Sequence, residues 1–143
     1  MEFELIPYVG VLPLQFGMPR EEIQSQLGQS PSLVSGKPFR DNFDILAVNY
    51  DAKELASEFC LFPKGLELTL NQQIVLEVGR FRNPLKVLLQ YDPEPLQAFG
   101  FLIFMALGVS ISGYHDGNPA QRAFNVFGKG TYDKFLTKAV PFK

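Results

Sequence analysis

Residues 99–117 read FGFLIFMALGVSISGYHDG and include the longest apolar run of the 143-residue chain. Within residues 99–106 both the odd and the even positions are mostly apolar, which is typical of a strand covered on both faces. Gly108 marks a turn, and residues 109–114 then alternate apolar residues and glycine with serine and tyrosine, which is typical of a strand with one solvent-exposed face. The stretch therefore predicts a tight antiparallel hairpin around Gly108.

Two short helices are predicted before this hairpin. Residues 19–27 begin with proline, carry two glutamates in the first turn and are followed by Gly28, a common residue at the end of a helix. A second helix starts at Pro84, with Asn83 as its N-terminal cap, and ends near Tyr91. Pro19 and Pro84 lie 65 positions apart, so each half of the chain has a short helix followed by strands. Residue identity between the halves is too low to indicate a duplication.

The remaining pattern predicts strands joined by short turns. Residues 29–42 read as a polar connector and residues 137–143 as a frayed end. Further strands are expected at residues 2–11 with an interruption at Pro7, and at residues 45–50, 55–62, 66–70, 74–78 and 123–127. The predicted fold class is α+β: one domain over residues 1–143, an antiparallel sheet of meanders and hairpins, and two short helices packed on one face.

Composition is that of an ordinary globular domain, with 20% charged residues, 46% hydrophobic residues and a net charge of −2. Residues 1–71 carry 10 acidic and 5 basic residues, whereas residues 72–143 carry 5 and 8. This balance argues against nucleic-acid binding, and the apolar run is shorter than the roughly 20 residues of a membrane helix. The N-terminus lacks the basic and apolar regions of a signal peptide, so a cytoplasmic location without membrane association is predicted.

Catalytic and metal-binding chemistry finds little support in the sequence. Cys60 and His115 are the single cysteine and the single histidine, which excludes an internal disulfide and gives no metal-ligand spacing. The pair His115–Asp116 has the residue types of an acid–base site, but the following Gly117 and Asn118 are typical of a turn. No catalytic residue, cofactor or metal is therefore predicted. A small hydrolase or transferase using His115 remains the enzymatic alternative.

Three segments resemble small bacterial immunity proteins that accompany contact-dependent or polymorphic toxins. They are GVLPLQFGMPREEIQSQLG at residues 10–28, YDPEP at residues 91–95 and LGVSISGYHDGNPAQRAFNVFGKGTYD at residues 107–133. The first segment is also similar to other small α+β bacterial families, including β-lactamase-inhibitor-like domains. The resemblance implies a non-enzymatic protein that binds and neutralises a cognate toxin, and it brings no catalytic residues with it.

A protein partner is therefore expected, and the acidic first half would face a basic toxin domain such as a nuclease. Tyrosine is also favoured at protein interfaces. The predicted partner-binding residues are Glu21, Glu22, Asp41, Asp44, Asp51, Glu54, Tyr114, His115 and Asp116. A self-associating structural module is a further alternative, and the sequence leaves the oligomeric state open.

Overall fold

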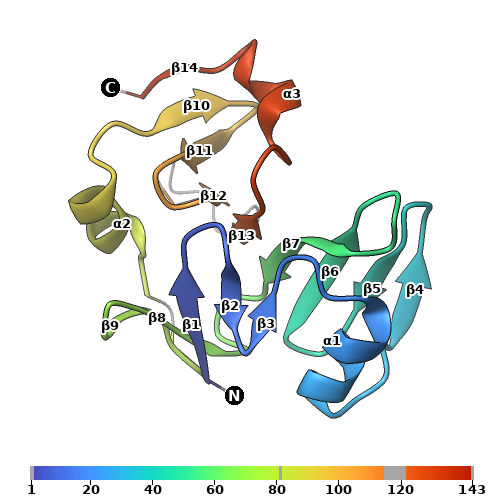
Figure 1. Ribbon diagram of the computed structural model, residues 1–143. Coiled ribbons are helices and arrows are strands. Elements are labelled where there is room, and N and C mark those ends of the chain that lie inside the picture. Colours follow the sequence, from blue (N-terminus) through green and yellow to red (C-terminus); the bar gives the residue numbers. More distant parts are fainter. Residues whose placement is uncertain (1, 81, 115–121, 143) are drawn as a thin grey trace.

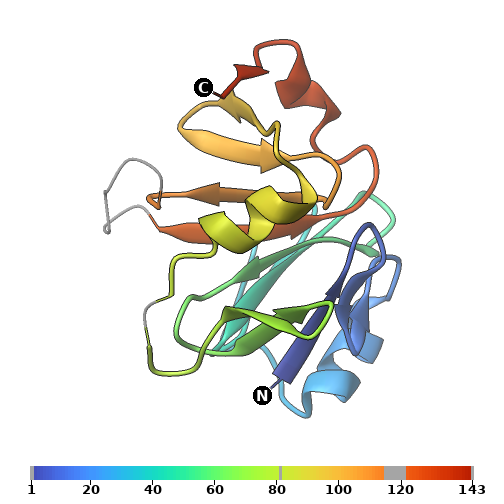
Figure 2. The same cartoon turned by 90° about the vertical axis from the view of Figure 1, so that its left-hand side faces the viewer.

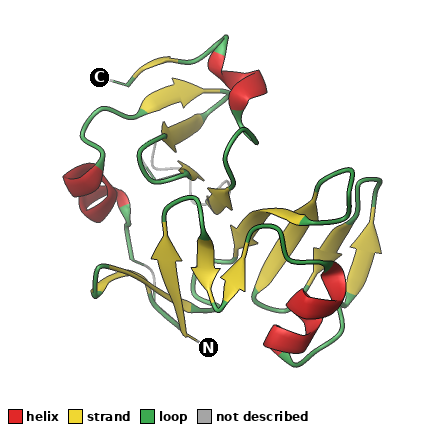
Figure 3. Ribbon diagram, in the orientation of Figure 1, coloured by secondary structure: helices red, strands yellow, loops and turns green. Residues whose placement is uncertain are grey.

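The computed structural model describes residues 2–80, 82–114 and 122–142 and is mostly β (Figure 1). A smaller sheet contains β1 (Glu2–Ile6), β2 (Gly10–Leu12), β3 (Leu14–Gln15), β8 (Glu67–Leu70) and β9 (Gln73–Leu76). A larger sheet contains β4 (Leu33–Ser35), β5 (Arg40–Asn42), β6 (Leu46–Tyr50), β7 (Ala56–Leu61), β10 (Leu96–Ala98), β11 (Phe101–Phe104), β12 (Val109–Ser112), β13 (Ala123–Phe127) and β14 (Val140–Pro141). The described helices are α1 (Arg20–Leu27), α2 (Leu85–Tyr91) and α3 (Asp133–Leu136), and they lie at the periphery of the sheets (Figure 3).

The predicted hairpin is confirmed: β11 and β12 are antiparallel neighbours, with Leu102 opposite Ile111. Gly108 closes the turn with a φ of 67°, and its backbone N–H donates to the Phe104 carbonyl at 2.9 Å. Leu102 and Phe104 enter the main core, whereas Ile103 packs in a second cluster on the opposite face. Both faces of β11 are therefore covered, as its continuous apolar pattern predicts.

The polar face of β12 differs from the prediction of a solvent-exposed face. Ser110 is fully buried and Ser112 is 8% exposed. The segment after β13 crosses over this face, and the Tyr132 hydroxyl lies 2.8 Å from Ser110 Oγ. Serine in an alternating pattern predicts polar surroundings, which for Ser110 are the Tyr132 hydroxyl and the Asn125 amide.

Both predicted helices form near their predicted boundaries. Ile23 and Leu27 bury one face of α1, and Gly28 ends it with a φ of 69°. At the start of α2, Asn83 Oδ1 accepts a hydrogen bond of 3.0 Å from the Leu85 backbone N–H. The caps predicted from glycine and asparagine are thus present in the structure.

The predicted arrangement of one sheet with two helices on one face needs correction. Of the strands expected to form one meander, β6 and β7 pair as predicted, but β8 and β9 lie in the smaller sheet, where β8 pairs in parallel with β1 and Phe3 is opposite Leu68. The alternation of residues 66–70 fits a strand of either sheet and does not encode its neighbour. The polar connector supplies β4 and β5, and the chain end supplies β14, which pairs with β10. α1 and α2 pack on the main core, whereas Phe135 of the unpredicted α3 packs on the second cluster.

Apart from β14 at one edge, the order of the larger sheet is symmetric about the pair β7–β13. It runs β14-β10-β11-β12-β13-β7-β6-β5-β4, so α1 followed by β4 to β7 mirrors α2 followed by β10 to β13. α1 and α2 accordingly lie at opposite sides of the molecule (Figure 1), and the antiparallel pair β7–β13 joins the halves. The repeated order of elements gives the 65-residue spacing of Pro19 and Pro84 a structural counterpart.

The main core lies between the two sheets and draws on both halves of the chain. It includes Phe3 and Leu68 from the smaller sheet and Phe59 and Phe104 from the larger. A second view shows the smaller sheet against the middle of the larger one, with the two chain ends far apart (Figure 2). The face of the larger sheet turned away from this core is therefore left to be covered by other segments.

Candidate functional site

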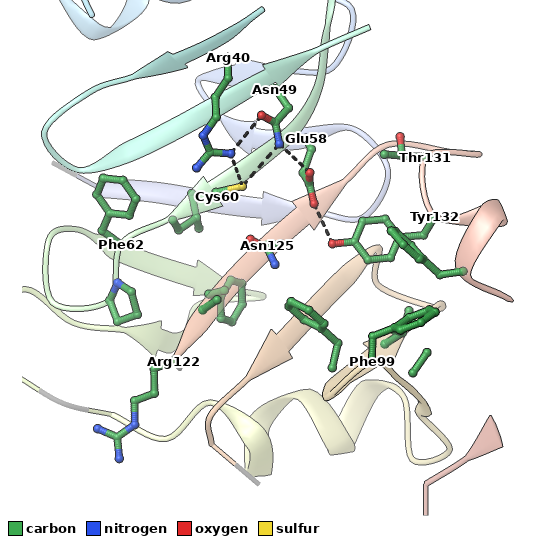
Figure 4. A pocket seen from close by; sticks show the side chains of 18 of the residues that line it. Arg40, Asn49, Glu58, Cys60, Phe62, Phe99, Arg122, Asn125, Thr131 and Tyr132 are labelled. Carbon is green, nitrogen blue, oxygen red and sulfur yellow. Dashed lines mark hydrogen bonds between the residues drawn. The ribbon is translucent and has the colours of Figure 1, made fainter. Parts of the chain in front are cut away.

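A pocket of about 530 Å³ lies on the face of the larger sheet turned away from the main core (Figure 4). β5, β6, β7, β11 and β13 supply its floor, and the segment from Thr131 to Phe135 supplies one wall. Side chains alternate along β7, so Glu58 and Cys60 face the pocket whereas Phe59 faces the core. The volume is in the range of sites that hold small molecules.

One side of the pocket is a row of hydrogen-bonded polar side chains. Arg40, Asn49 and Glu58 lie directly opposite one another on β5, β6 and β7. Arg40 Nη1 donates to Asn49 Oδ1 at 3.0 Å, and Asn49 Nδ2 donates to Glu58 Oε1 at 2.8 Å (Figure 4). The pairing register of β5, β6 and β7 is therefore sufficient to bring the three side chains together, because cross-strand partners on one face are close neighbours.

The row continues through Tyr132 into the second half of the chain. The Tyr132 hydroxyl donates to Glu58 Oε2 at 2.7 Å and lies 2.8 Å from Ser110 Oγ, which also accepts from Asn125 Nδ2 at 3.3 Å. The pKa of Tyr132 is raised far above its usual value, mainly because the side chain is buried and also because the negative charge of Glu58 is close. The phenol therefore stays protonated and holds the Glu58 carboxylate in place.

Cys60 lies beside this row without the properties of a nucleophile. Its Sγ is 3.5 Å from Arg40 Nη1. The pKa of the thiol is nevertheless raised to about 11, mainly because the thiol is buried and also because the negative charge of Glu58 is close. Arg40 opposes this shift without reversing it. At neutral pH the thiol is protonated, and a protonated thiol is a poor nucleophile.

This pKa predicts slow chemistry at Cys60. At pH 8, reaction with an aromatic disulfide reagent such as DTNB should be about a hundredfold slower in the native protein than in the unfolded chain in guanidinium chloride, because the thiolate fraction falls with the raised pKa. The native rate should continue to rise up to a pH of about 11. A native rate that levels off below pH 9 would contradict this expectation.

The other side of the pocket is apolar and mostly aromatic. Phe99 is 65% exposed, and its ring centroid lies 5.8 Å from that of Phe135. Phe135 in turn lies 5.2 Å from the Tyr132 ring, while Phe62 is placed across the pocket near Arg40 (Figure 4). Phe101 and Ile103 of β11 complete the apolar lining. One face of the long apolar stretch therefore lines the pocket directly.

Five of the predicted partner-binding residues are exposed on the surface. Glu21 and Glu22 lie on α1, Asp51 and Glu54 in the turn between β6 and β7, and Asp44 in the turn between β5 and β6. The start of α1 and the turn between β6 and β7 lie side by side, because the backbone N–H of Ala56, the first residue of β7, donates to the carbonyl of Met18 at 2.9 Å. We call Glu21, Glu22, Asp51 and Glu54 the acidic end; Asp44 lies at the opposite end of β6.

Two predicted contact residues have buried side chains, which a partner could not contact directly. Asp41 has no exposed surface and receives a bidentate pair from Arg20, with Nη2 to Oδ1 at 2.8 Å and Nε to Oδ2 at 3.0 Å. Tyr114 is only 7% exposed, with the Arg122 guanidinium 5.7 Å from its ring centroid. The remaining two, His115 and Asp116, lie outside the described residues.

Sequence reasoning missed Arg40, Asn49, Glu58 and Tyr132 as members of one site. A signal was present in residues 55–62, where Glu58, Cys60 and Phe62 fall on the same face of the predicted strand. Arg40 gave none, because β5 was predicted as part of a connector. The wall formed by Tyr132 depends on how the chain folds back after β13, which no local pattern specifies.

Within the described parts of the chain, no group of three or more His, Cys, Asp or Glu residues is placed to hold a metal ion. In the same residues, no helix has the length and apolarity needed to span a membrane. Comparisons with protein-family models, with curated proteins and with solved structures find no match to this chain. The site therefore has to be interpreted from its own geometry.

Proposed function

We propose that the chain is a non-enzymatic, cytoplasmic protein-binding module, and specifically an immunity-type protein that binds and blocks a bacterial toxin with a basic surface. The observation that carries this proposal is the outer edge of β4, the last strand of the larger sheet. All three β4 residues are exposed, including Leu33 at 61% and Val34 at 44%. An exposed sheet edge with apolar side chains supports pairing with a strand of another protein.

The acidic end lies next to this edge. The turn between β4 and β5 borders a shallow depression whose lining includes Lys37, Asp51 and Glu54. Lys37 and the exposed Lys53 offset part of this negative charge, so the four carboxylates of the acidic end outnumber the two lysines beside them. A partner with a basic surface would gain both in its rate of association and in orientation from this arrangement.

The proposal is tested with the product of the neighbouring gene, because immunity-type proteins are encoded beside the toxins they block. We expect the two purified proteins to bind and the present chain to abolish the toxin's activity. Replacing both Glu21 and Glu22 with lysine should weaken binding by about tenfold or more at low salt, mainly through slower association. Asp51 is left unchanged, because its carboxylate accepts backbone hydrogen bonds within its own turn.

The matched control is the double variant Glu4→Lys/Glu94→Lys, which makes the same charge change at exposed positions on β1 and before β10. Its affinity for the toxin should stay within about twofold of the unmodified chain, apart from a general charge effect that salt suppresses. Absence of binding to the neighbouring product would contradict the toxin assignment. Equal losses in both double variants would contradict the choice of surface.

A further inference from the structure

The Arg40 guanidinium lies in the pocket without a carboxylate partner among the described residues. It is held by neutral oxygens, with Nη1 3.0 Å from Asn49 Oδ1 and Nε 3.4 Å from Asn42 Oδ1. Arg20, Arg80 and Arg82, by contrast, each form an ion pair with a carboxylate. Arg40 Nη2 donates no hydrogen bond to a described residue, so it can still bind an anion.

The carboxylate nearest to Arg40 in the pocket is already engaged. Glu58 accepts from Asn49 at 2.8 Å through one oxygen and from Tyr132 at 2.7 Å through the other. Apart from Arg122, whose guanidinium is engaged at the Tyr114 ring, the described lining holds two cations, Arg40 and Lys134, and one carboxylate. A partly enclosed site with this excess of positive charge attracts anions.

The opposite wall determines what the rest of a ligand must be. Phe99, Phe101 and Phe135 present aromatic surface, and Phe99 is unusually exposed for phenylalanine, at 65%. Aromatic rings bind apolar groups and favour stacked or edge-to-face contact with other rings. We propose that this pocket binds a small organic anion with an aromatic body, whose anionic group pairs with Arg40 while its ring lies against the phenylalanine wall.

This proposal is independent of the protein partner, whose surface is the β4 edge and the acidic end. The geometry separates two contributions, because the guanidinium and the phenylalanine wall lie on different sides of the pocket (Figure 4). Removing the charge should affect anions alone, whereas filling the apolar space should affect every ligand of this shape. The two parts can therefore be tested with two probes and two kinds of variant.

The probes are 2-naphthoate and its neutral analogue 2-naphthamide, titrated into the full chain by calorimetry and followed by amide chemical shifts. We expect naphthoate to bind more tightly than naphthamide and to shift amides of β5, β6, β7 and β13. Arg40→Gln should weaken naphthoate by about tenfold to a hundredfold, because it removes a charge-assisted hydrogen bond, and should change naphthamide by less than about twofold. Arg80→Gln, at an exposed position outside the pocket lining, should change neither.

Two further variants keep the test decisive. Arg40→Lys retains the charge and should retain naphthoate binding better than Arg40→Gln, even if both lose some stability. Ala123→Phe places a ring inside the pocket and should weaken both probes. The proposal is overturned if naphthoate binds the unmodified chain no more tightly than naphthamide. Equal losses of naphthoate in Arg40→Gln and Arg80→Gln, or chemical shifts confined to other strands, would also overturn it.

Discussion

Replacing Arg20 with methionine is expected to lower the free energy of unfolding by about 3–5 kcal/mol, because it leaves the Asp41 carboxylate buried without its ionic partner. Asp41 has no exposed surface, whereas Arg20 is 26% exposed and contacts it through two nitrogens at 2.8 and 3.0 Å. The guanidinium also lies 4.3 Å from the centroid of the Phe39 ring. Urea unfolding followed by circular dichroism measures the change.

Two variants identify the buried charge as the cause. Arg80→Met removes an arginine that is 80% exposed and 3.6 Å from Glu77, so it should cost less than about 1 kcal/mol. The double variant Arg20→Met/Asp41→Leu removes both charges and should be more stable than Arg20→Met alone, since no carboxylate is left unpaired. A cost for Arg20→Met no larger than that for Arg80→Met would show that the pair contributes little.

Local signals in the sequence were sufficient for the central hairpin and for the helices α1 and α2. Gly108 and the change of pattern around it predicted the β11–β12 hairpin, and Gly28 and Asn83 predicted helix boundaries. These residues act through the backbone of their own segment, which explains why they can be interpreted without tertiary information. The assignment of β8 to a separate sheet, in parallel with β1, depends on a contact between residues more than sixty positions apart. Hydrophobic alternation contains no information of this kind.

The candidate site was less accessible to sequence reasoning than the fold. Acidic residues were expected at the surface because of their charge alone. This expectation is correct for Glu21, which is exposed, and wrong for Asp41, which is buried. Asp41 differs from Glu21 because it forms an ion pair with Arg20, which lies on the helix α1 and not on the strand that carries Asp41. Glu58 likewise became part of a pocket because Tyr132 returns across the sheet. Pairings between distant segments, rather than residue type, decide which polar groups are buried.

Gly108→Ala should lower the free energy of unfolding by about 2–4 kcal/mol, which would make the central hairpin one of the most sensitive points of the chain. Two effects add at this position. The φ of 67° is costly for a residue with a Cβ, and that Cβ would lie 2.9 Å from the Phe127 carbonyl oxygen and 3.3 Å from Tyr8 Cε1. Relief by movement is blocked, because the Gly108 carbonyl accepts a 2.8 Å hydrogen bond from the Phe127 backbone N–H.

The matched control is Gly100→Ala, which precedes β11 at the other end of the same strand. Gly100 has a comparable φ of 82°, but a Cβ there would meet no atom within 4 Å. Only the backbone strain remains, so Gly100→Ala should cost about 1–2 kcal/mol. Urea unfolding of both variants separates strain from steric overlap, since the difference between them measures the contact with β13 and Tyr8. Equal costs would mean that β12 and β13 can separate freely at this turn, which would contradict the tight central packing on which the pocket floor depends.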